Sequence, residues 1–391
     1  MASLKFRLFG NLSFLQSLDK EKVLSRLLAS HSDYFLRQGL DVNALSNDDA
    51  CARQLLEVFT KSDEDMPGDL LSDLYILDEI SDEDGVQRIF EEADHKGISL
   101  KLFPDDVSPG DFAALVLLEH PIVVKVCHEK LVARQVKRYY EYRSCDDRRF
   151  DLSATETGKD KIKAILGPWF EEKKRTRTCE LFVYQEGNEI HILITHGALF
   201  RADGNITNHL ELSRLGWRPQ KHDSIIYDTK TGVLKIHASY DPERKAYREA
   251  LGQVLANNMG YFLDAAPYCL HSLQTNSGVL TLVDGLEWAC LTEVTLEVDA
   301  VDCRRQDLKG DDLTEMVSGT GTLAMLPGGI VRACFMLSYK SGGRPRKLEV
   351  RLPNVADYNR DKDGGVTEAF LRANGFLIAG DTDANGLVDA A

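Results

Sequence analysis

The sequence predicts an α+β protein, in which an N-terminal all-helical domain is followed by a mostly antiparallel β-rich domain with a few helices. Two observations predict this order. Over about the first 145 residues, apolar side chains recur at steps of three and four, which is the period of an amphipathic helix. From Thr178 onward apolar and polar residues alternate, which is the period of a strand. A chain of 391 residues is long enough for two or three domains.

The helical domain is predicted from a series of short amphipathic segments. Several of them begin with residues that favour helix N-termini, such as Ser81-Asp82-Glu83-Asp84 and Ser108-Pro109. Pro121 interrupts the pattern, and we expect it to begin a new helix that runs to Tyr142. The segments are Leu18–Leu28, Asp49–Phe59, Met66–Ile80, Ser81–Gly97, Ser108–Leu118 and Pro121–Tyr142.

The remaining boundaries follow from changes in composition. We expect domain 1 to span residues 1–145, a polar linker 146–160, the α+β domain 161–378 and a polar tail 379–391. Within the α+β domain, a short helix at Lys161–Leu166 should end at Gly167-Pro168. Two hairpins, a helix, four strands and a closing helix should follow, at Glu180–Thr195, Asp223–Ser239, Asp241–Met259, Val279–Val283, Trp288–Val298, Ile330–Tyr339, Lys347–Leu352 and Val366–Ile378.

Charge is distributed unevenly along the chain. The whole chain has a formal net charge of −15, while residues 41–120 alone hold 21 acidic and 5 basic residues. Residues 125–178 are basic, with 15 Lys and Arg against 9 Asp and Glu. The eight cysteines stand singly, which argues against a zinc ribbon or a disulfide framework. No apolar run is long enough to span a bilayer and the N-terminus does not resemble a signal peptide, so we expect a cytoplasmic protein.

The basic stretch is the main candidate for a binding site. Four of its residues share a face of the helix expected after Pro121, and more cations follow Trp169-Phe170. Lysine and arginine neutralise phosphates, and aromatic rings stack on unpaired bases. The pattern therefore indicates nucleic-acid binding, and the alternative that we favour is a solvated face or docking against the protein's own acidic segment at 41–120. The candidates are Lys130, Arg134, Lys137, Arg138, Lys173, Lys174, Arg175 and Arg177.

A second basic turn follows Gly342-Gly343. Arg344 and Arg346 decorate a predicted hairpin tip, where they could reach a phosphate backbone. The simpler interpretation, which we favour, is that charge protects an exposed strand edge.

Three residues form part of a nuclease pattern. Asp223, Asp228 and Lys235 lie on a predicted hairpin, as in enzymes where two carboxylates hold a divalent ion beside a lysine. Val233 stands where the second carboxylate should be, so a plain hairpin with turn acids is the preferred interpretation. His191 and His196 differ by five positions and should project to opposite faces of a strand, which argues against a histidine metal site there.

The C-terminal tail resembles the beginning of a calcium-binding loop. Asp381, Asp383 and Asn385 are spaced as oxygen ligands, and Gly386 follows at the sixth position. The glutamate required at position twelve would lie beyond Ala391. A polar tail is the favoured interpretation, so we predict no metal there. Phosphate-binding and dinucleotide-binding motifs are absent from the sequence, and we predict no cofactor.

Three stretches together resemble a group of uncharacterised bacterial proteins with no assigned activity. They are Trp169–Arg175, Arg218–Asp228 with Thr231–Ala238, and Arg351–Ala356 with Tyr358–Asp361. The resemblance extends over the chain to about Ile378. It implies a bacterial cytosolic origin and a tail that lies outside the shared fold.

These observations lead to two hypotheses of function. The first is a non-catalytic binding or adaptor protein, such as an accessory factor in bacterial nucleic-acid processing or defence. Its acidic helices would contact a protein partner, and the basic stretch would contact nucleic acid or the protein itself. The second is a metal-dependent nuclease or phosphodiesterase in the β-rich domain. Whether the protein is an enzyme is left open at this point.

Overall fold

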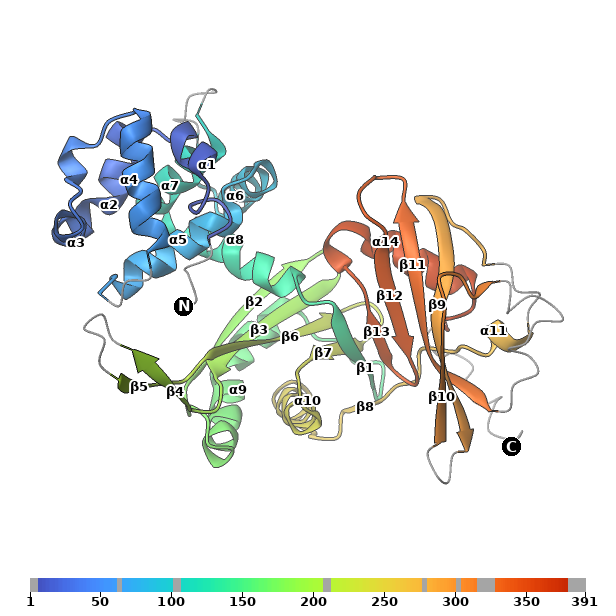
Figure 1. The fold of residues 1–391 in the computed structure, drawn as a ribbon. Coiled ribbons are helices and arrows are strands. Elements are labelled where there is room, and N and C mark those ends of the chain that lie inside the picture. The colour runs from blue at the N-terminus through green and yellow to red at the C-terminus, as the bar shows by residue number, and fades with distance from the viewer. Residues whose placement is uncertain are drawn as a thin grey trace. The chain divides into compact units, whose positions relative to one another are not determined.

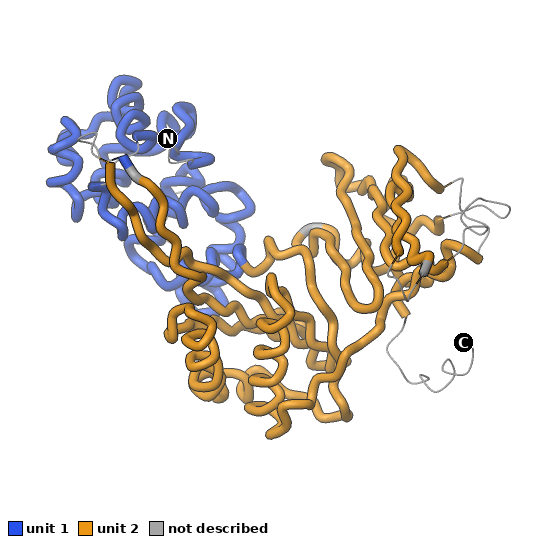
Figure 2. The backbone as a smooth tube through the Cα atoms, turned by 60° about the horizontal axis from the view of Figure 1, so that its bottom comes forward, with its two compact units in different colours: residues 1–132, 206–211 blue, residues 133–205, 212–391 orange. Residues whose placement is uncertain are grey.

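The protein is described by a computed structural model, which covers residues 6–61, 65–100, 107–206, 212–275, 280–299, 304–314 and 328–378. The chain divides into two compact units (Figure 2). Unit 1 contains residues 1–132 and 206–211, and unit 2 contains residues 133–205 and 212–391. Helices precede a large antiparallel sheet with further helices (Figure 1), so the predicted α+β class and its order are confirmed.

Unit 1 is a bundle of short helices. Side-chain caps explain where several begin, because Asp48, Asp82 and Ser108 accept hydrogen bonds from the first-turn N–H groups of their helices. Leu55, Phe59 and Leu74 belong to its continuous apolar core. The helices are α1 (Leu12–Ser17), α2 (Ser25–Leu28), α3 (Ser32–Arg37), α4 (Asp49–Thr60), α5 (Gly68–Ile80), α6 (Glu83–His95), α7 (Pro109–Glu119) and α8 (Pro121–Arg134).

Unit 2 is built on one eleven-stranded sheet. The strand order is β10-β9-β11-β12-β13-β1-β7-β6-β3-β2, with β8 beside β1, and every pairing described in it is antiparallel. The strands are β1 (Arg138–Ser144), β2 (Cys179–Glu186), β3 (Glu189–Gly197), β6 (Gln220–Asp228), β7 (Val233–His237), β8 (Phe262–Asp264), β9 (Leu286–Asp299), β10 (Arg304–Lys309), β11 (Gly329–Tyr339), β12 (Arg346–Arg351) and β13 (Val355–Asp357). Two more strands, β4 (Arg201–Ile206) and β5 (Leu212–Trp217), form a separate two-stranded ribbon.

Helices cover opposite faces of the sheet in its two halves. Helices α9 (Leu152–Glu172) and α10 (Asp241–Ala256) pack on β2, β3, β6 and β7, while α14 (Arg360–Ala373) packs on β9, β11 and β12. Tyr140 pairs with Ile236 in the first core, and its neighbour Tyr139 pairs with Ala356 in the second core. Because successive residues of a strand point to opposite faces, these pairings place the two cores on opposite sides of β1. The short helix α11 (Ser272–Thr275) completes the unit.

The predicted helix from Pro121 to Tyr142 is wrong in its second half. Helix α8 ends at Arg134, and β1 begins at Arg138. Tyrosines at 139, 140 and 142 favour a strand, and β1 pairs with β7, β13 and β8. Sheet pairing therefore overrides the helical spacing of the basic residues, and the division between the units falls at Val132, not at 145.

The linker predicted at 146–160 is also different in the structure. Helix α9 begins at Leu152, with Asp151 as its N-cap, and continues through Pro168 to Glu172. Its inward face includes Thr155 and Gly158, which are small or polar residues and so give little apolar signal. The predicted helix from Asp241 is present and ends at Ala256, and both predicted hairpins are present, whereas no strand forms at 280–283. The predicted polar tail, 379–391, lies outside the described residues.

No helix in the described ranges combines the length and the apolar character that crossing a bilayer requires.

Candidate functional site

The predicted basic face around α8 is largely neutralised by ion pairs. Nζ of Lys130 lies 2.7 Å from Glu92, and Arg134 lies 2.6 Å from Glu186 and 3.8 Å from Asp361. Arg138, now on β1, lies 2.9 Å from Asp357. Lys137 is exposed in the turn between α8 and β1. The four cations therefore do not form one helix face. Among the ion pairs of the described residues, that of Lys130 with Glu92 involves the acidic segment 41–120, whereas those of Arg134 and Arg138 do not.

The cations after Trp169 divide into paired and exposed residues. Lys173 and Arg177 form ion pairs of 2.8 and 3.0 Å with Glu172 and Glu171. The Arg175 side chain is 9% exposed and is paired with Glu243. Lys174 is exposed and has a positive φ of 60°. The N–H groups of Lys174 and Arg175 bond to the carbonyls of Glu171 and Phe170, which is a Schellman motif that ends α9 and fixes this turn.

The ribbon of β4 and β5 was not predicted, and it adjoins this turn. Nη1 of Arg218 donates to the carbonyl of Lys174 at 2.8 Å, and the N–H of Gly197 donates to Oγ1 of Thr176 at 3.0 Å. We call the ribbon with its flanking residues, 199–205 and 212–218, together with the turn 173–177, the ribbon surface. Its two parts come from segments more than twenty residues apart but are held together by these bonds.

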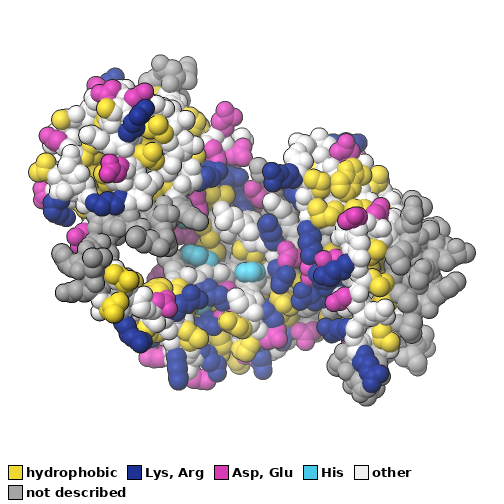
Figure 3. Space-filling view, viewed as in Figure 1, with side chains coloured by type: hydrophobic (Ala, Val, Ile, Leu, Met, Phe, Trp, Pro, Cys, Tyr) yellow, Lys and Arg dark blue, Asp and Glu magenta, His cyan; other side chains and the backbone are white. Residues whose placement is uncertain are grey.

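The ribbon surface exposes apolar and aromatic side chains. Leu212 is 88% exposed, Phe200 59% and Trp217 36%. The Phe200 ring lies over Gly216, where an added Cβ would come within 2.5 Å of it, and the Arg218 guanidinium lies 5.8 Å from the ring centroid. Figure 3 shows hydrophobic and basic side chains gathered together at the position of β4 and β5. Exposure of this kind indicates a contact surface.

Four cations of the ribbon surface differ from those of α8 in their partners. Within the described part of the chain, no acidic side chain forms an ion pair with Lys174, Arg201, Arg214 or Arg218. Elsewhere on unit 2, acidic and basic side chains are interleaved in the view of Figure 3. The ribbon surface therefore keeps positive charge of the kind that Lys130, Arg134 and Arg138 lose to internal pairs.

The second predicted basic turn is partly neutralised. Arg346 forms an ion pair with Asp363 and lies 5.1 Å from the ring centroid of Tyr339, whereas Arg344 is exposed. The turn lies between β11 and β12. A single exposed arginine is weaker support for a phosphate contact than the ribbon surface provides.

The predicted nuclease residues do not come together. On β6 and β7, Ile226 pairs with Lys235 and Ile225 with Ile236. Lys235 therefore shares a face with Ile226, while Asp223 shares the opposite face with Ile225. Asp228 accepts hydrogen bonds from the N–H groups of Lys230 and Thr231 and serves the turn. Lys235 lies 3.2 Å from Glu189 on the other side of the sheet.

Asp223 instead belongs to a cluster of polar and charged residues beneath α9 and α10, which we call the buried cluster. Its members are Arg175, His196, Lys221, Asp223, Glu243 and Tyr247. They come from the turn after α9, from β3, β6 and α10. His196 and Asp223 lie on the α9 side of the sheet, opposite to His191, as the strand period predicts.

Both carboxylates of the buried cluster are strongly held. Oδ2 of Asp223 accepts hydrogen bonds from Nε2 of His196 at 2.9 Å and from the hydroxyl of Tyr247 at 2.6 Å. Nζ of Lys221 lies 2.8 Å from both oxygens of Glu243 and 3.2 Å from Oδ1 of Asp223. Burial acts to raise the pKa of Asp223, but the bond from His196 and the charge of Lys221 outweigh it and the pKa is lowered. Burial and the adjacent Asp223 charge raise the pKa of Tyr247 well above its usual value.

Sequence reasoning missed most of this cluster. Lys221 and Asp223 are two positions apart on a predicted strand and so share a face, which was an available signal. His196 lies 27 and Tyr247 24 positions from Asp223, and only the strand pairing and the packing of α10 bring them together.

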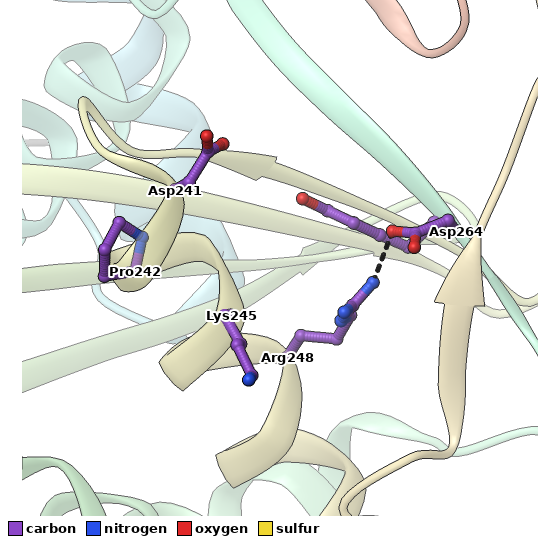
Figure 4. Close-up of a pocket in the computed structure, with 6 residues that line it drawn as sticks. Asp241, Pro242, Lys245, Arg248 and Asp264 are labelled. Carbon is purple, nitrogen blue, oxygen red and sulfur yellow. Dashed lines mark hydrogen bonds and ion pairs between the residues drawn. The ribbon is translucent and has the colours of Figure 1, made fainter.

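A separate pocket lies beside α10, with a volume of about 350 Å³. Figure 4 shows Lys245 and Arg248 on α10, with the Arg248 guanidinium directed at Asp264 of β8, 2.6 Å away. Arg248 also lies 4.8 Å from the ring centroid of Tyr142. Asp241 and Pro242 complete the lining. Two acids balance the two cations, so the pocket has no net charge that would select a ligand.

The predicted calcium-loop residues Asp381, Asp383 and Asn385 lie outside the described residues. Comparison with models of known protein families gives no match, and comparison with curated proteins gives none either.

Proposed function

We propose that this protein binds nucleic acid through the ribbon surface. The observation that carries the proposal is the combination, on one ribbon and its adjoining turn, of exposed aromatic rings with cations that have no acidic partner among the described residues. Cations of this kind attract phosphates, and Phe200 and Trp217 offer faces for base stacking. A two-stranded ribbon also fits the major groove of a duplex.

The basic face predicted around α8 has a smaller part in this proposal. Three of its cations already form ion pairs, namely Lys130 with Glu92, Arg134 with Glu186 and Arg138 with Asp357. A phosphate would have to replace a close internal carboxylate at each of them. Among the cations predicted from the sequence, Lys174 is the one that belongs most directly to the proposed binding surface. It is exposed, and its carbonyl accepts the hydrogen bond from Arg218.

The proposal also includes a cellular location and a protein partner. The resemblance of the chain to a group of bacterial proteins supports work in a bacterial cytoplasm, as an accessory factor in nucleic-acid processing or defence. The acidity of residues 41–120 supports contact of the helices in unit 1 with a protein partner, since this segment contains 21 acidic and only 5 basic residues.

Charge reversal on the ribbon tests the proposal. Binding of fluorescent single-stranded and duplex oligonucleotides is measured for the wild type and for Arg201→Glu/Arg214→Glu. The variant should bind at least about tenfold more weakly, because two phosphate contacts become repulsive. The matched control Lys161→Glu/Lys230→Glu makes the same change of charge in the middle of α9 and in the turn between β6 and β7. Absence of wild-type binding, or an equal loss in the control, contradicts the proposal.

A metal-dependent nuclease or phosphodiesterase is the second candidate function. The observation that favours it is that Asp223 and Glu243 lie together beside Lys221, although Asp228 and Lys235 lie elsewhere. Cleavage of DNA or RNA that requires a divalent ion and is lost in Asp223→Ala would support it. Cleavage that persists in Asp223→Ala, or no cleavage with Mg²⁺ or Mn²⁺, would reject it.

A further inference from the structure

Three side chains of the buried cluster have the chemistry and spacing of metal ligands. One ligand atom each from His196, Asp223 and Glu243 lies within 4.8 Å of the other two. They come from β3, β6 and α10, which are fixed by the sheet register and by the apolar core beneath α10. All three are buried, so bulk water does not compete for these atoms.

A second observation points to a ligand at this place. Oδ1 of Asp223 is fully buried and makes no hydrogen bond, whereas Oδ2 makes two. Its nearest cation is Nζ of Lys221 at 3.2 Å, outside hydrogen-bond geometry. A buried carboxylate oxygen without a hydrogen bond is costly, and the ammonium group 3.2 Å away offsets that cost only through its charge.

Lys221 marks where that cation belongs. Its ammonium group lies within 3.2 Å of Asp223 and 2.8 Å of Glu243. The Lys221 side chain is 21% exposed, whereas those of Asp223 and Glu243 are 0% and 1% exposed. The ammonium also lies 5.6 Å from the ring centroid of Tyr240, which is exposed. Lys221 therefore has a route to solvent that the carboxylates lack.

We propose that His196, Asp223 and Glu243 form a site for a divalent transition metal, and that Lys221 closes it by placing its own ammonium group between the carboxylates. One imidazole nitrogen and two carboxylates suit Zn²⁺ or Mn²⁺. Mg²⁺ prefers oxygen ligands alone and keeps its waters, so the histidine favours the transition metals. The metal and the ammonium group compete for the same oxygens, and Lys221 must turn toward solvent before the metal binds.

Removal of the lysine amine is the direct test. Zn²⁺ and Mn²⁺ binding is measured by calorimetry on the full chain for the wild type, Lys221→Ala and His196→Ala/Lys221→Ala. Lys221→Ala should bind one ion per chain at least about tenfold more tightly than the wild type, and the double variant should return to the wild-type affinity or below. Lys163→Ala is the matched control, because it removes a lysine from an exposed pair with Glu180 and should leave metal affinity unchanged.

Two results would overturn the proposal. One is a metal affinity of Lys221→Ala no higher than that of the wild type, and the other is an equally high affinity in the double variant. If Lys221→Ala does not fold without metal, Lys221→Gln replaces it, because glutamine keeps a hydrogen-bond donor toward Glu243. Neither measurement involves nucleic acid, so failure here is separate from failure of the ribbon surface to bind it.

Discussion

Two regions of this protein contain several basic residues but differ in what surrounds them. Around α8 and β1, Lys130, Arg134 and Arg138 lie within 2.9 Å of acidic side chains. On the ribbon surface, Arg201 and Arg214 form no ion pair with any described acidic residue. In the first region internal ion pairs neutralise the positive charge, and in the second the charge stays exposed. The difference shows that a count of charged residues does not reveal which cations are available for binding.

The largest effect expected from this comparison is on stability. Arg134→Ala removes the partner of Glu186 and Asp361 and should lower the free energy of unfolding by about 2–3 kcal/mol, because partly buried carboxylates lose their counter-ion. Arg214→Ala should change it by less than about 0.5 kcal/mol, as expected for an exposed, unpaired side chain. Urea unfolding followed by circular dichroism measures both. Equal losses in the two variants would contradict the division into paired and unpaired cations.

Sequence patterns foretold much of the fold and little of this division. Helices α4 to α7 were visible because apolar spacing and caps such as Asp82 and Ser108 agree. The ribbon was not visible, because β5 is exposed at every position and so shows no alternation. Whether an arginine is paired depends on residues far away in the chain, as Arg138 and Asp357 illustrate with 219 positions between them. Local patterns carry no information about such pairs.

A second prediction concerns ion pairs in the other half of the sheet, and it tests whether they also stabilise the fold. Glu349 of β12 accepts hydrogen bonds from Arg332 at 3.0 Å and Arg351 at 2.7 Å. Burial acts to raise the pKa of Glu349, but the hydrogen bonds and charges of these arginines outweigh it and lower the pKa well below its usual value. Glu349→Gln should therefore cost about 2 kcal/mol at neutral pH.

The pH dependence of that cost has a definite sign. A lowered pKa in the folded protein gives stability that is present above the unfolded pKa of about 4.3 and is lost as the pH falls through the folded value. The wild type should thus exceed Glu349→Gln in stability at pH 7, and the difference should shrink as the pH falls below about 4. Urea titrations of both proteins from pH 7 to pH 3 measure it. A difference that does not change with pH would mean that the carboxylate charge is not the source.

A third prediction concerns the aromatic part of the ribbon surface. Trp217→Ala should weaken binding to single-stranded oligonucleotides by about 1–3 kcal/mol, the range for one stacked base. Trp288→Ala is the matched control, because Trp288 is 40% exposed on β9 and Trp217 36% exposed on β5. Fluorescence anisotropy gives both affinities. A loss of affinity in the Trp288 variant as large as that in the Trp217 variant would show that the ribbon has no special role.

The smallest effect concerns one charge. Lys174 occupies the left-handed position of the Schellman motif with its side chain exposed. Alanine, like lysine, has a Cβ atom and would have the same backbone strain in this conformation. Lys174→Ala should therefore fold with nearly unchanged stability. If Lys174 contacts one phosphate, the slope of log affinity against log salt should fall by about 0.7–0.9 in magnitude. Lys173→Ala, one residue earlier, removes a lysine that is paired with Glu172 at 2.8 Å. Its slope should change less than that of Lys174→Ala, and the reverse order would contradict the assignment of free and paired cations within this turn.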